Sequence, residues 1–208
     1  MNTKDEVRYW KDMNNDYRGT TTQHGNIMVV ENALVEFTFN AIGEGSYLLI
    51  SYISPGTNMM QFIELLRLNI NKNTVILDYS GFPTDFSAIR KGMYVDAIYS
   101  PVLTRSNPPQ SSAFLIVIKT DHQATLGFTM DQIIEVDIDN NCLYTGSADD
   151  TGNRIKFTIS DKTFIRDQTG VPADIHSPQP GQSARIIHAA LKNNGTPQEI
   201  AALYIQLI

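Results

Sequence analysis

The chain has 208 residues, a length that fits one large or two small domains with a substantial buried core. Apolar residues make up 42% of it and charged residues 18%, which is typical of a soluble globular protein. With 16 basic and 22 acidic residues the net charge is −6, and no region is basic, which argues against a phosphate-binding surface of clustered Lys and Arg.

Cysteine content and hydropathy bear on the cellular compartment. Cys142 is the only cysteine, so the chain cannot form an intramolecular disulfide, and this favours a reducing compartment. The first residues, MNTKDEVRYWKDMNNDYRG, lack the apolar core of a signal peptide. No run approaches the roughly 18 consecutive apolar residues of a transmembrane helix. We therefore expect a cytoplasmic protein without a membrane partner.

Residues 1–25 precede the first regular pattern. Val7, Tyr9 and Trp10 are apolar within KDEVRYWKDMNND, which is compatible with a short helix and equally with a loose arm. The sequence does not choose between the two, so residues 1–25 are assigned as an N-terminal arm or short helix.

Beyond this segment, apolar side chains recur with a period of two, which is the period of a strand. In ALVEFTFNA, Val35, Phe37 and Phe39 are predicted to lie on one face of a strand, with polar residues on the other. Residues 133–139 (IIEVDID) and 154–160 (RIKFTIS) alternate in the same way. Clusters of Gly, Pro, Asn and Asp separate these runs, so the pattern indicates short strands with one buried face.

The second half of the chain repeats the first. Shifting residues 68–116 by 89 positions lays LNINKNTVILDYSGFPTD on FTISDKTFIRDQTGVPAD. Glycine and proline are the residues that form turns, so their recurrence at one common offset indicates that the same fold occurs twice. The identical pairs at this offset include Ile70/Ile159, Thr74/Thr163, Ile76/Ile165, Asp78/Asp167, Gly81/Gly170, Pro83/Pro172, Asp85/Asp174, Gly92/Gly181, Pro108/Pro197, Ala113/Ala202 and Ile116/Ile205.

The repeat sets the domain boundaries. We place the first unit at residues 26–119 and the second at residues 120–208. The polar stretch KTDHQATLG, residues 119–127, joins them and is short for a flexible linker, so the units are expected to touch. Each shared block predicts a short strand, a Gly-x-Pro turn, a second glycine turn, an alternating strand, a proline loop and a final apolar run.

The last run, residues 195–208, admits two interpretations. Thr196, Pro197 and Glu199 could cap and begin a helix. The matching segment SNPPQSSAFLIVI, residues 106–118, has no capping acid and alternates as a strand, so we predict strands in both copies. Five or six short strands per unit predict an all-β protein of two tandem small β-barrels, OB-like or Greek-key, that arose from an internal duplication.

No arrangement of residues predicts catalysis, a cofactor or a metal ion. The histidines are at least twelve positions apart, and His188 alternates with apolar residues, so we predict a structural histidine. Cys142 has no Cys or His nearby and is expected to be a small buried side chain. DIDNNC, residues 137–142, lacks the glycine and glutamate of a calcium loop, so we assign its acids to a turn.

Two pairs of acids recur because the repeat does. Asp78/Asp167 and Asp85/Asp174 stand beside glycine and proline in both copies, which favours turn caps over acid–base pairs. An active site is one constellation, whereas these features occur twice. We therefore expect no enzyme, and no catalytic, cofactor-binding or metal-binding residue is assigned; the binding residues stay unknown.

The repeated block also resembles a known kind of domain. T-x-I-x-D-x-x-G-x-P, a glycine before an alternating strand, and PPQSSAFLI are similar to small β-barrel domains of unknown function in bacterial proteins. The resemblance covers about 50 residues of each copy, and the second copy departs from it with NNGTPQEIA at the loop. It implies an OB-like barrel present as a tandem pair, and it implies no catalytic residues.

Three functions are compatible with the sequence. The leading hypothesis is a non-catalytic binding or structural protein that associates with itself or with another protein. The alternative is an enzyme or small-ligand-binding protein with a site between the units, where His188, Arg105 and Tyr99 could converge.

The third hypothesis is a module for an oligosaccharide or for single-stranded nucleic acid. Four tyrosines of the first unit could form a stacking platform, but few basic residues accompany them, so nucleic acid is not the expected partner. These tyrosines are Tyr47, Tyr52, Tyr94 and Tyr99.

Overall fold

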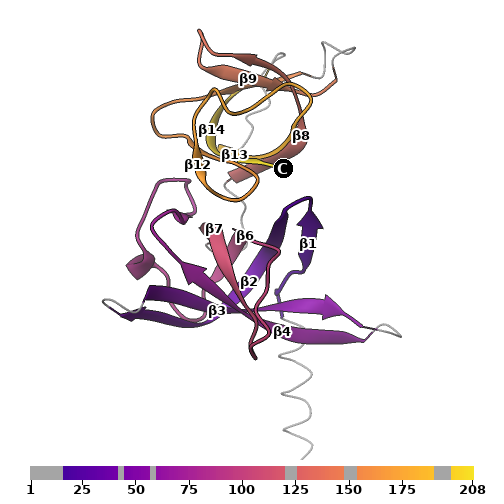
Figure 1. The fold of residues 1–208 in the computed structure, drawn as a ribbon. Helices are drawn as coiled ribbons and strands as arrows, with labels where there is room; N and C mark the ends of the chain where they lie inside the picture. The colour runs from indigo at the N-terminus through magenta and orange to yellow at the C-terminus, as the bar shows by residue number, and fades with distance from the viewer. Residues whose placement is uncertain (1–15, 42–44, 57–59, 120–125, 148–153, 190–197) are drawn as a thin grey trace, which may run out of the picture.

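The computed structural model describes residues 16–41, 45–56, 60–119, 126–147, 154–189 and 198–208 (Figure 1). In this part of the chain every regular element is a β-strand apart from one 3₁₀ turn, η2 (Phe86–Ala88). The strands form two seven-stranded sheets, one before residue 120 and one after it. This confirms the prediction of an all-β protein of two tandem barrel-like units; residues 1–15 lie outside the described residues.

The first unit is a ring of five strands with two short additions. Around the ring the order is β2–β3–β4–β7–β6 and back to β2. Only the contact between β4 and β7 within this ring is parallel. The strands are β1 (Thr21–His24), β2 (Ile27–Ala41), β3 (Gly45–Pro55), β4 (Gln61–Ile70), β5 (Val75–Leu77), β6 (Tyr94–Tyr99) and β7 (Gln110–Lys119). Because β1 pairs with β2, the first sheet begins inside the segment that we had assigned to the N-terminal arm.

The second unit closes the same ring, with a much shorter hairpin of β9 and β10 in the place of β3 and β4. Its order is β8–β9–β10–β14–β13 and back to β8, again with one parallel contact within the ring, between β10 and β14. The strands are β8 (Leu126–Asp137), β9 (Cys142–Thr145), β10 (Ile155–Thr158), β11 (Phe164–Arg166), β12 (Pro172–Ala173), β13 (Ser183–Ala189) and β14 (Gln198–Leu207). Of the C-terminal run, Gln198–Leu207 is therefore a strand, as predicted, and not a helix; residues 195–197 lie outside the described residues.

The two units repeat one another residue for residue in the shared block. Val75 lies opposite Leu115, and Phe164 lies opposite Tyr204, which are the positions 89 residues further on. Thr74 donates its hydroxyl to the carbonyl of the residue 39 positions on at 2.7 Å, and Thr163 does the same at 2.7 Å. The 89-residue offset between the two sequence repeats thus also relates the paired strand positions of the first unit to those of the second.

The recurring aspartates are turn caps. Asp78 accepts hydrogen bonds from the backbone N–H groups two and four residues further on, at 2.8 and 3.0 Å. Asp167 accepts from the same two positions at 2.8 and 2.9 Å. Asp85 and Asp174 each accept from the N–H two residues on, at 2.8 and 3.0 Å. The prediction of caps is confirmed for all four.

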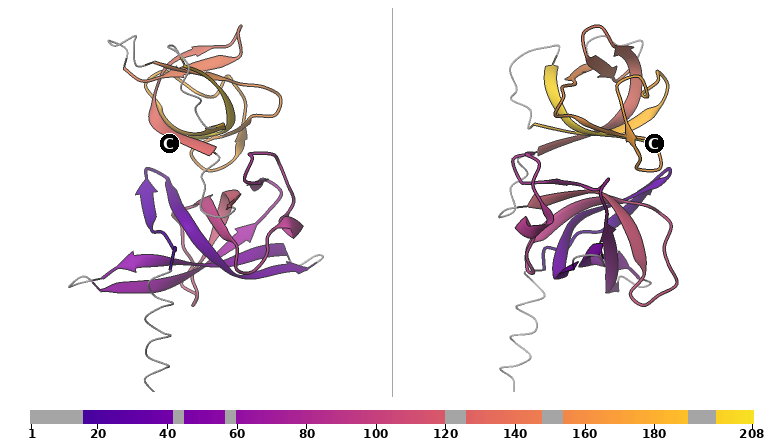
Figure 2. Two further views of the ribbon diagram at one scale, coloured as in Figure 1. Left: turned by 180° about the vertical axis from the view of Figure 1, so that it is seen from behind. Right: turned by 60° about the vertical axis from the view of Figure 1, so that its left-hand side comes forward.

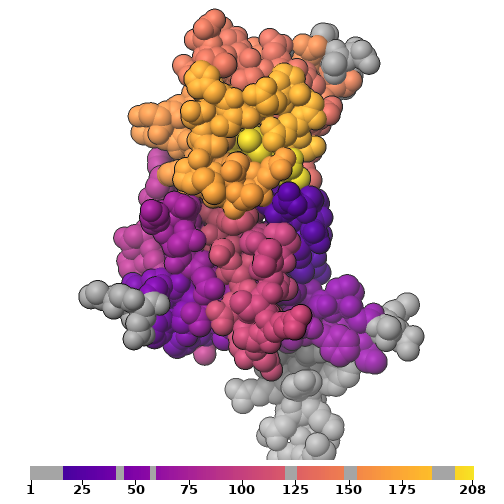
Figure 3. Space-filling model, in the orientation of Figure 1, coloured from indigo at the N-terminus to yellow at the C-terminus, as the bar shows by residue number. Residues whose placement is uncertain are grey.

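Each barrel has its own apolar core, and a third apolar cluster joins the two barrels. The first core includes Leu48, Ile50, Leu68 and Ile116, and the second includes Leu143, Phe157, Ile186 and Ile205. The third cluster combines Ile27, Val29, Leu77, Ile98, Phe114, Leu115 and Val117 of the first unit with Leu126, Ile187 and Tyr204 of the second. The units therefore touch, as expected, and Figures 2 and 3 show the two lobes meeting along a broad front.

The contact between the units is reciprocal. A Cβ at Gly81 would overlap the side chain of Leu203, and a Cβ at Gly170 would overlap the ring of Phe114. Gly81 and Gly170 are equivalent in the repeat, and so are Phe114 and Leu203. Each barrel thus presents a glycine turn to an apolar side chain of the other, which is the arrangement of a two-fold interface.

Two arginines of the second unit border this apolar contact. Arg185 Nη2 lies 2.9 Å from Glu31 Oε1, and its guanidinium also lies over the ring of Phe128 at 5.2 Å. Arg166 Nη2 donates to the carbonyl of Asn73 at 3.0 Å. Both bonds cross from one barrel to the other, so polar contacts flank the apolar centre of the interface.

No helix among the described residues is long and apolar enough to cross a membrane. The cytoplasmic location expected from the sequence stays a prediction.

Candidate functional site

Among the described residues, the histidines and the cysteine considered from the sequence lie in different parts of the fold. Among the described residues no group of three or more His, Cys, Asp or Glu could hold a metal ion. His188 is buried in the second barrel, where its Nε2 lies 3.1 Å from Thr129 Oγ1 and its ring lies 5.4 Å from that of Phe157. Cys142 is buried in β9. Both side chains occupy the core positions that the sequence predicted.

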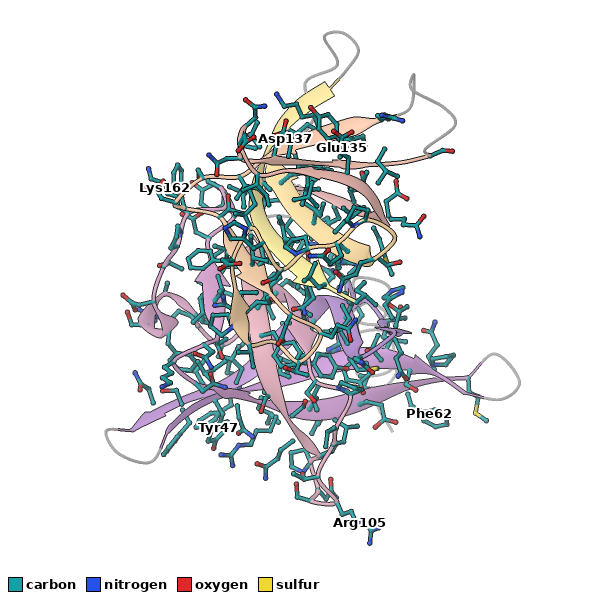
Figure 4. The ribbon with its side chains drawn as sticks, turned by 45° about the horizontal axis from the view of Figure 1, so that its top comes forward. Tyr47, Phe62, Arg105, Glu135, Asp137 and Lys162 are labelled. Carbon is teal, nitrogen blue, oxygen red and sulfur yellow. The ribbon has the colours of Figure 1, made fainter. Side chains whose placement is uncertain are left out.

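The three residues considered for a site between the units lie apart. Tyr99 is in the first barrel, where its hydroxyl is 2.9 Å from Thr21 Oγ1 and burial raises its pKa to about 12. His188 belongs to the other barrel, and Arg105 lies at the tip of an exposed loop at the bottom of Figure 4. The structure does not bring these residues together, and the surface between the units is the apolar cluster described above.

The acidic segment 137–142 forms a turn. Asp137 Oδ2 accepts a hydrogen bond from the Asn140 amide at 2.8 Å, and Asp137 Oδ1 accepts one from the Asn140 backbone at 3.1 Å. These two bonds lower the pKa of Asp137 below its usual value. The geometry is that of a local cap, in agreement with the interpretation drawn from the sequence.

A β-bulge in β2 turns two phenylalanines outward. Val35 lies opposite Ile50, and Phe37 lies opposite Leu49, so Glu36 is an extra residue on this strand. Val35 is consequently in the core, whereas Phe37 is 48% exposed. The expectation that Val35, Phe37 and Phe39 share one face was therefore wrong, because an inserted residue reverses the alternation that follows it.

Hydrogen bonds hold the bulge residue in place. Ser51 Oγ donates to Glu36 Oε1 at 2.7 Å, and Arg18 Nη2 donates to the same oxygen at 3.1 Å. Arg18 Nε also donates to Ser51 Oγ at 2.7 Å. The bond from Ser51, followed by that from Arg18, lowers the pKa of Glu36. The chain segment before β1 thus anchors the part of β2 that directs Phe37 to the surface.

The outward side chains of β2, β3 and β4 form a stacked row. The Phe39 and Tyr47 rings are 5.0 Å apart with an angle of 21° between their planes, and the Phe37 ring lies 6.3 Å from Tyr47. On the other side of Tyr47, the guanidinium of Arg67 lies 3.8 Å from the ring centroid. A cation over an aromatic face at this distance is attractive.

Two amide side chains extend this row. Arg67 Nε donates to Asn69 Oδ1 at 2.9 Å, and Asn69 Nδ2 reaches Gln110 Oε1 at 3.5 Å. We call the surface of Phe37, Phe39, Tyr47, Arg67, Asn69 and Gln110 the aromatic face. It combines flat apolar rings with hydrogen-bonding groups, which is the composition of ligand sites.

The loop of residues 100–109 borders the aromatic face. Its carbonyl at Pro109 accepts a hydrogen bond from Arg67 N at 2.9 Å. Thr104 and Gln110 close the loop through two bonds of 3.0 Å, one from Thr104 N to the Gln110 carbonyl and one from Gln110 N to Thr104 Oγ1. The peptide bond between Asn107 and Pro108 is cis. The bonds between Thr104 and Gln110 close the loop at its base, and Arg105 is exposed within it.

The second barrel lacks an aromatic face at the equivalent positions. A bulge also follows Ile133 in β8, and the strand pairing sets Glu135 in the place of Phe37 and Asp137 in the place of Phe39. Lys156 corresponds to Arg67. Figure 4 shows Tyr47 in the lower unit and the two acids at the far end of the upper unit. The same barrel thus forms with an acidic surface, so barrel formation does not require the aromatic face.

The tyrosines considered as a stacking platform do not form one. Tyr47 is on the outer surface, whereas Tyr52 packs against the first core and Tyr99 is inside it. Arg67 was not singled out from the sequence, although it stands opposite an outward position of β3. Arg67 could have been identified only from the register in which β3 and β4 pair, and a single sequence does not reveal that register.

A hollow of about 390 Å³ lies at one end of the second barrel. Its walls combine turn residues with core side chains, among them Asn141, Ser160, Thr163, Ile165 and Asp174. Asp174 and Thr163 already serve as a cap and a strand tie, so this hollow follows from the local architecture.

Comparison of the chain with family models and with curated proteins gives no match.

Proposed function

We propose that the protein is a non-catalytic binding protein and that the aromatic face of its first barrel binds an oligosaccharide. The observation that carries the proposal is the row of Phe39, Tyr47 and Arg67 on an outer surface, with Phe37 exposed beside it. The second copy of the fold replaces both phenylalanines by acids. A feature present in one copy only is not needed for the architecture and is a candidate for function.

The order of the strands supports this choice of surface. Five strands in a closed ring, with one parallel contact, are typical of the OB type. Barrels of this type bind oligosaccharides and oligonucleotides on the face of their second and third strands and on adjoining loops. In the first unit these parts are β3, β4 and the loop of residues 100–109, which carry or border the aromatic face.

The chemistry of the face favours sugar over nucleic acid. Sugar rings have flat C–H surfaces that pack on aromatic rings and hydroxyls that bond to amides and guanidinium groups, here Asn69, Gln110 and Arg67. Binding of single strands also needs a basic groove along the phosphates. The chain has a net charge of −6, and residues 26–119 carry six basic against seven acidic side chains.

The rest of the molecule serves as a support in this proposal. The second barrel packs on the first through the apolar cluster, to which the first unit contributes residues of β5, β6, β7 and the first residues of β2. A site between the units has no geometric support, since His188, Arg105 and Tyr99 lie apart.

Binding measurements with matched variants test the proposal. A panel of oligosaccharides is titrated into the protein by calorimetry, and the best ligand is then measured with Phe37→Ala, Arg67→Ala and, as the control in the second barrel, Lys156→Ala. We expect each of the first two changes to weaken binding about tenfold or more and the control to leave it unchanged.

Three outcomes oppose the proposal. The absence of binding to any sugar of the panel, or equal affinity in Phe37→Ala and the unmodified protein, would contradict it. Binding of single-stranded oligonucleotides that weakens steeply with salt would instead assign the face to nucleic acid.

A further inference from the structure

The hairpin of β3 and β4 extends beyond the first barrel as an arm. β3 and β4 pair along their whole lengths, from Ser46 opposite Ile70 to Pro55 opposite Gln61. β7 pairs with β4 only at Arg67–Asn69. Among the described residues no strand covers the other edge of β4 from residue 61 to residue 66, and the arm projects to the right in Figure 1.

Pro109 ends the contact between β7 and β4. Arg67 N donates to the Pro109 carbonyl at 2.9 Å, which is the first bond of this parallel ladder. The next bond would run from the N–H of residue 109 to the Leu65 carbonyl, but proline has no N–H. The edge of β4 upstream of Arg67 is therefore open because of the proline loop.

Alternate residues of β4 direct their backbone groups to this open edge. Ile53 N donates to the Gly19 carbonyl at 2.8 Å, so the backbone N–H of Ile53 points away from β4. Ile53 and Ile63 are therefore a non-hydrogen-bonded pair, and the backbone N–H and C=O of Ile63 point away from β3, because the two opposite residues of an antiparallel pair either both point toward each other or both point away. With the period of two, the N–H and C=O groups of Gln61, Ile63 and Leu65 all point to the open edge.

The side chains of the arm are apolar and exposed. Met60 is 53% exposed, Phe62 51%, Ile63 54% and Leu65 41%. Proteins protect open edges with proline, lysine, bulges or short strands, and between Gln61 and Leu66 the only charged residue is Glu64. An apolar edge of this kind is a template for another strand.

The second barrel shows that the arm is dispensable for the fold. β10 begins at Ile155, which corresponds to Leu66, and all four of its residues pair with both β9 and β14. Barrel closure therefore needs nothing upstream of Leu66. The arm is an addition to the first unit, and its open edge is available for a partner.

We propose that β4 pairs through this edge with β4 of a second copy of the chain, antiparallel and about a two-fold axis at Ile63. This register sets Ile63 opposite Ile63 and Gln61 opposite Leu65, so about six main-chain hydrogen bonds form from the groups that point to the edge. Moving the axis to Glu64 would place two like charges opposite each other and would involve Arg67, which is bonded to Pro109. Of these two registers, the one about Ile63 avoids both the like charges and the bonded Arg67.

The exposed area sets the strength of this dimer. Four side chains that are each about half exposed offer on the order of 400 Å² of apolar surface per copy, about half of the ~800 Å² that each partner buries in a standard interface. We therefore expect a weak dimer that forms only at high protein concentration, so that the protein exchanges between monomer and dimer as its concentration changes.

Sedimentation velocity of the full chain from about 1 to 500 µM tests this pairing. We expect a concentration-dependent shift from monomer to dimer. Ile63→Lys and Ile63→Glu should each abolish the shift, because like charges would meet on the axis. An equimolar mixture of these two variants should restore a dimer. Val102→Lys, which adds a charge at an exposed apolar residue outside the arm, is the control and should behave as the unmodified protein.

A protein that is monomeric up to 500 µM would overturn the proposal, as would an unchanged dimer in Ile63→Lys. A mixture of the Lys and Glu variants that stays monomeric would overturn the register about Ile63. Thermal unfolding of each variant should match that of the unmodified protein, since Ile63 is outside the core.

Discussion

Replacement of Gly170 by alanine probes the contact between the barrels. Gly170 has a φ of 81°, and an added Cβ would overlap the ring of Phe114 in the other unit. Gly181 has a φ of 90°, and a Cβ there would meet nothing within 4 Å. The two positions share the same backbone conformation and differ only in what surrounds them, so Gly181→Ala is the matched control.

The structure sets the size of the expected effect. In both variants alanine in a left-handed conformation costs about 1 kcal/mol. Gly170→Ala additionally forces the Phe114 ring to move, and overpacking of this kind costs about 1–3 kcal/mol. We therefore expect Gly170→Ala to be less stable than Gly181→Ala by about 2 kcal/mol, or about 4–8 °C in melting temperature for a protein of this size.

Urea and thermal denaturation, followed by circular dichroism, measure this difference. The pair Gly170→Ala and Phe114→Ala should be less destabilising together than the sum of the single changes, because the smaller side chain removes the overlap. Equal stabilities of Gly170→Ala and Gly181→Ala, within about 0.5 kcal/mol, would refute the docking of the two barrels through this contact.

Three further predictions concern single side chains. The hydrogen bond from Ser51, and then that from Arg18, lowers the pKa of Glu36 in the folded protein. The ionised carboxylate therefore stabilises the fold above pH 4.5, the ordinary pKa of this group. This stabilisation is lost as the pH falls through the folded pKa. Glu36→Gln should therefore be less stable than the unmodified protein at pH 7, by no more than about 1 kcal/mol at this partly exposed site. Urea titrations should show this difference narrowing as the pH falls below 4.5, and a difference that does not narrow would contradict the assignment. Burial raises the pKa of Asp96 despite the Asn32 N–H at 2.7 Å and Lys119 Nζ at 3.1 Å, so its contribution to stability is lost as pH rises through the folded pKa. The unfolding free energy of the unmodified protein minus that of Asp96→Asn should fall between pH 3 and pH 7, and a rise would show that the bonds outweigh burial. Cys142 is fully buried, so a thiol reagent should label it only as fast as the second barrel opens, and rapid labelling in the absence of urea would contradict its position.

The turns and the duplication were predictable because glycine, proline and aspartate each favour particular positions in turns. Gly81 and Gly170 have φ values of 84° and 81°, so both turns use the backbone freedom that the shared glycines supply. Asp78 and Asp167 cap those turns through the same backbone groups. Local chemistry of this kind is visible in a single sequence, and a further identical pair at the same offset, Ile98 and Ile187, lies in the contact between the barrels.

The aromatic face depended on a feature that alternation alone does not reveal. The bulge at Glu36 reverses the faces of β2, and its stability comes from Ser51 and Arg18, which are distant in the sequence. Period-two reasoning assumes a regular strand and so placed Phe37 beside Val35. Long-range hydrogen bonds decided the outcome.

One feature of the sequence, the continuous apolar run in β7, reflects the contact between the barrels as well as the strand itself. The run AFLIVI in β7 is buried at every residue. Ala113, Ile116 and Ile118 face the first core, whereas Phe114, Leu115 and Val117 face the other barrel. A strand covered on both sides has a continuous apolar run, so this segment indicates an interface as well as a strand.

Binding of a sugar by the aromatic face is tested most directly by NMR of the backbone and side-chain amides, while the isotope-labelled protein is titrated with the oligosaccharide of the panel that binds best. We expect the signals of Phe37, Tyr47, Arg67 and Asn69 to shift while those of Glu135 and Lys156 in the second barrel stay in place. Shifts confined to the second barrel, or to residues at the contact between the units, would contradict it.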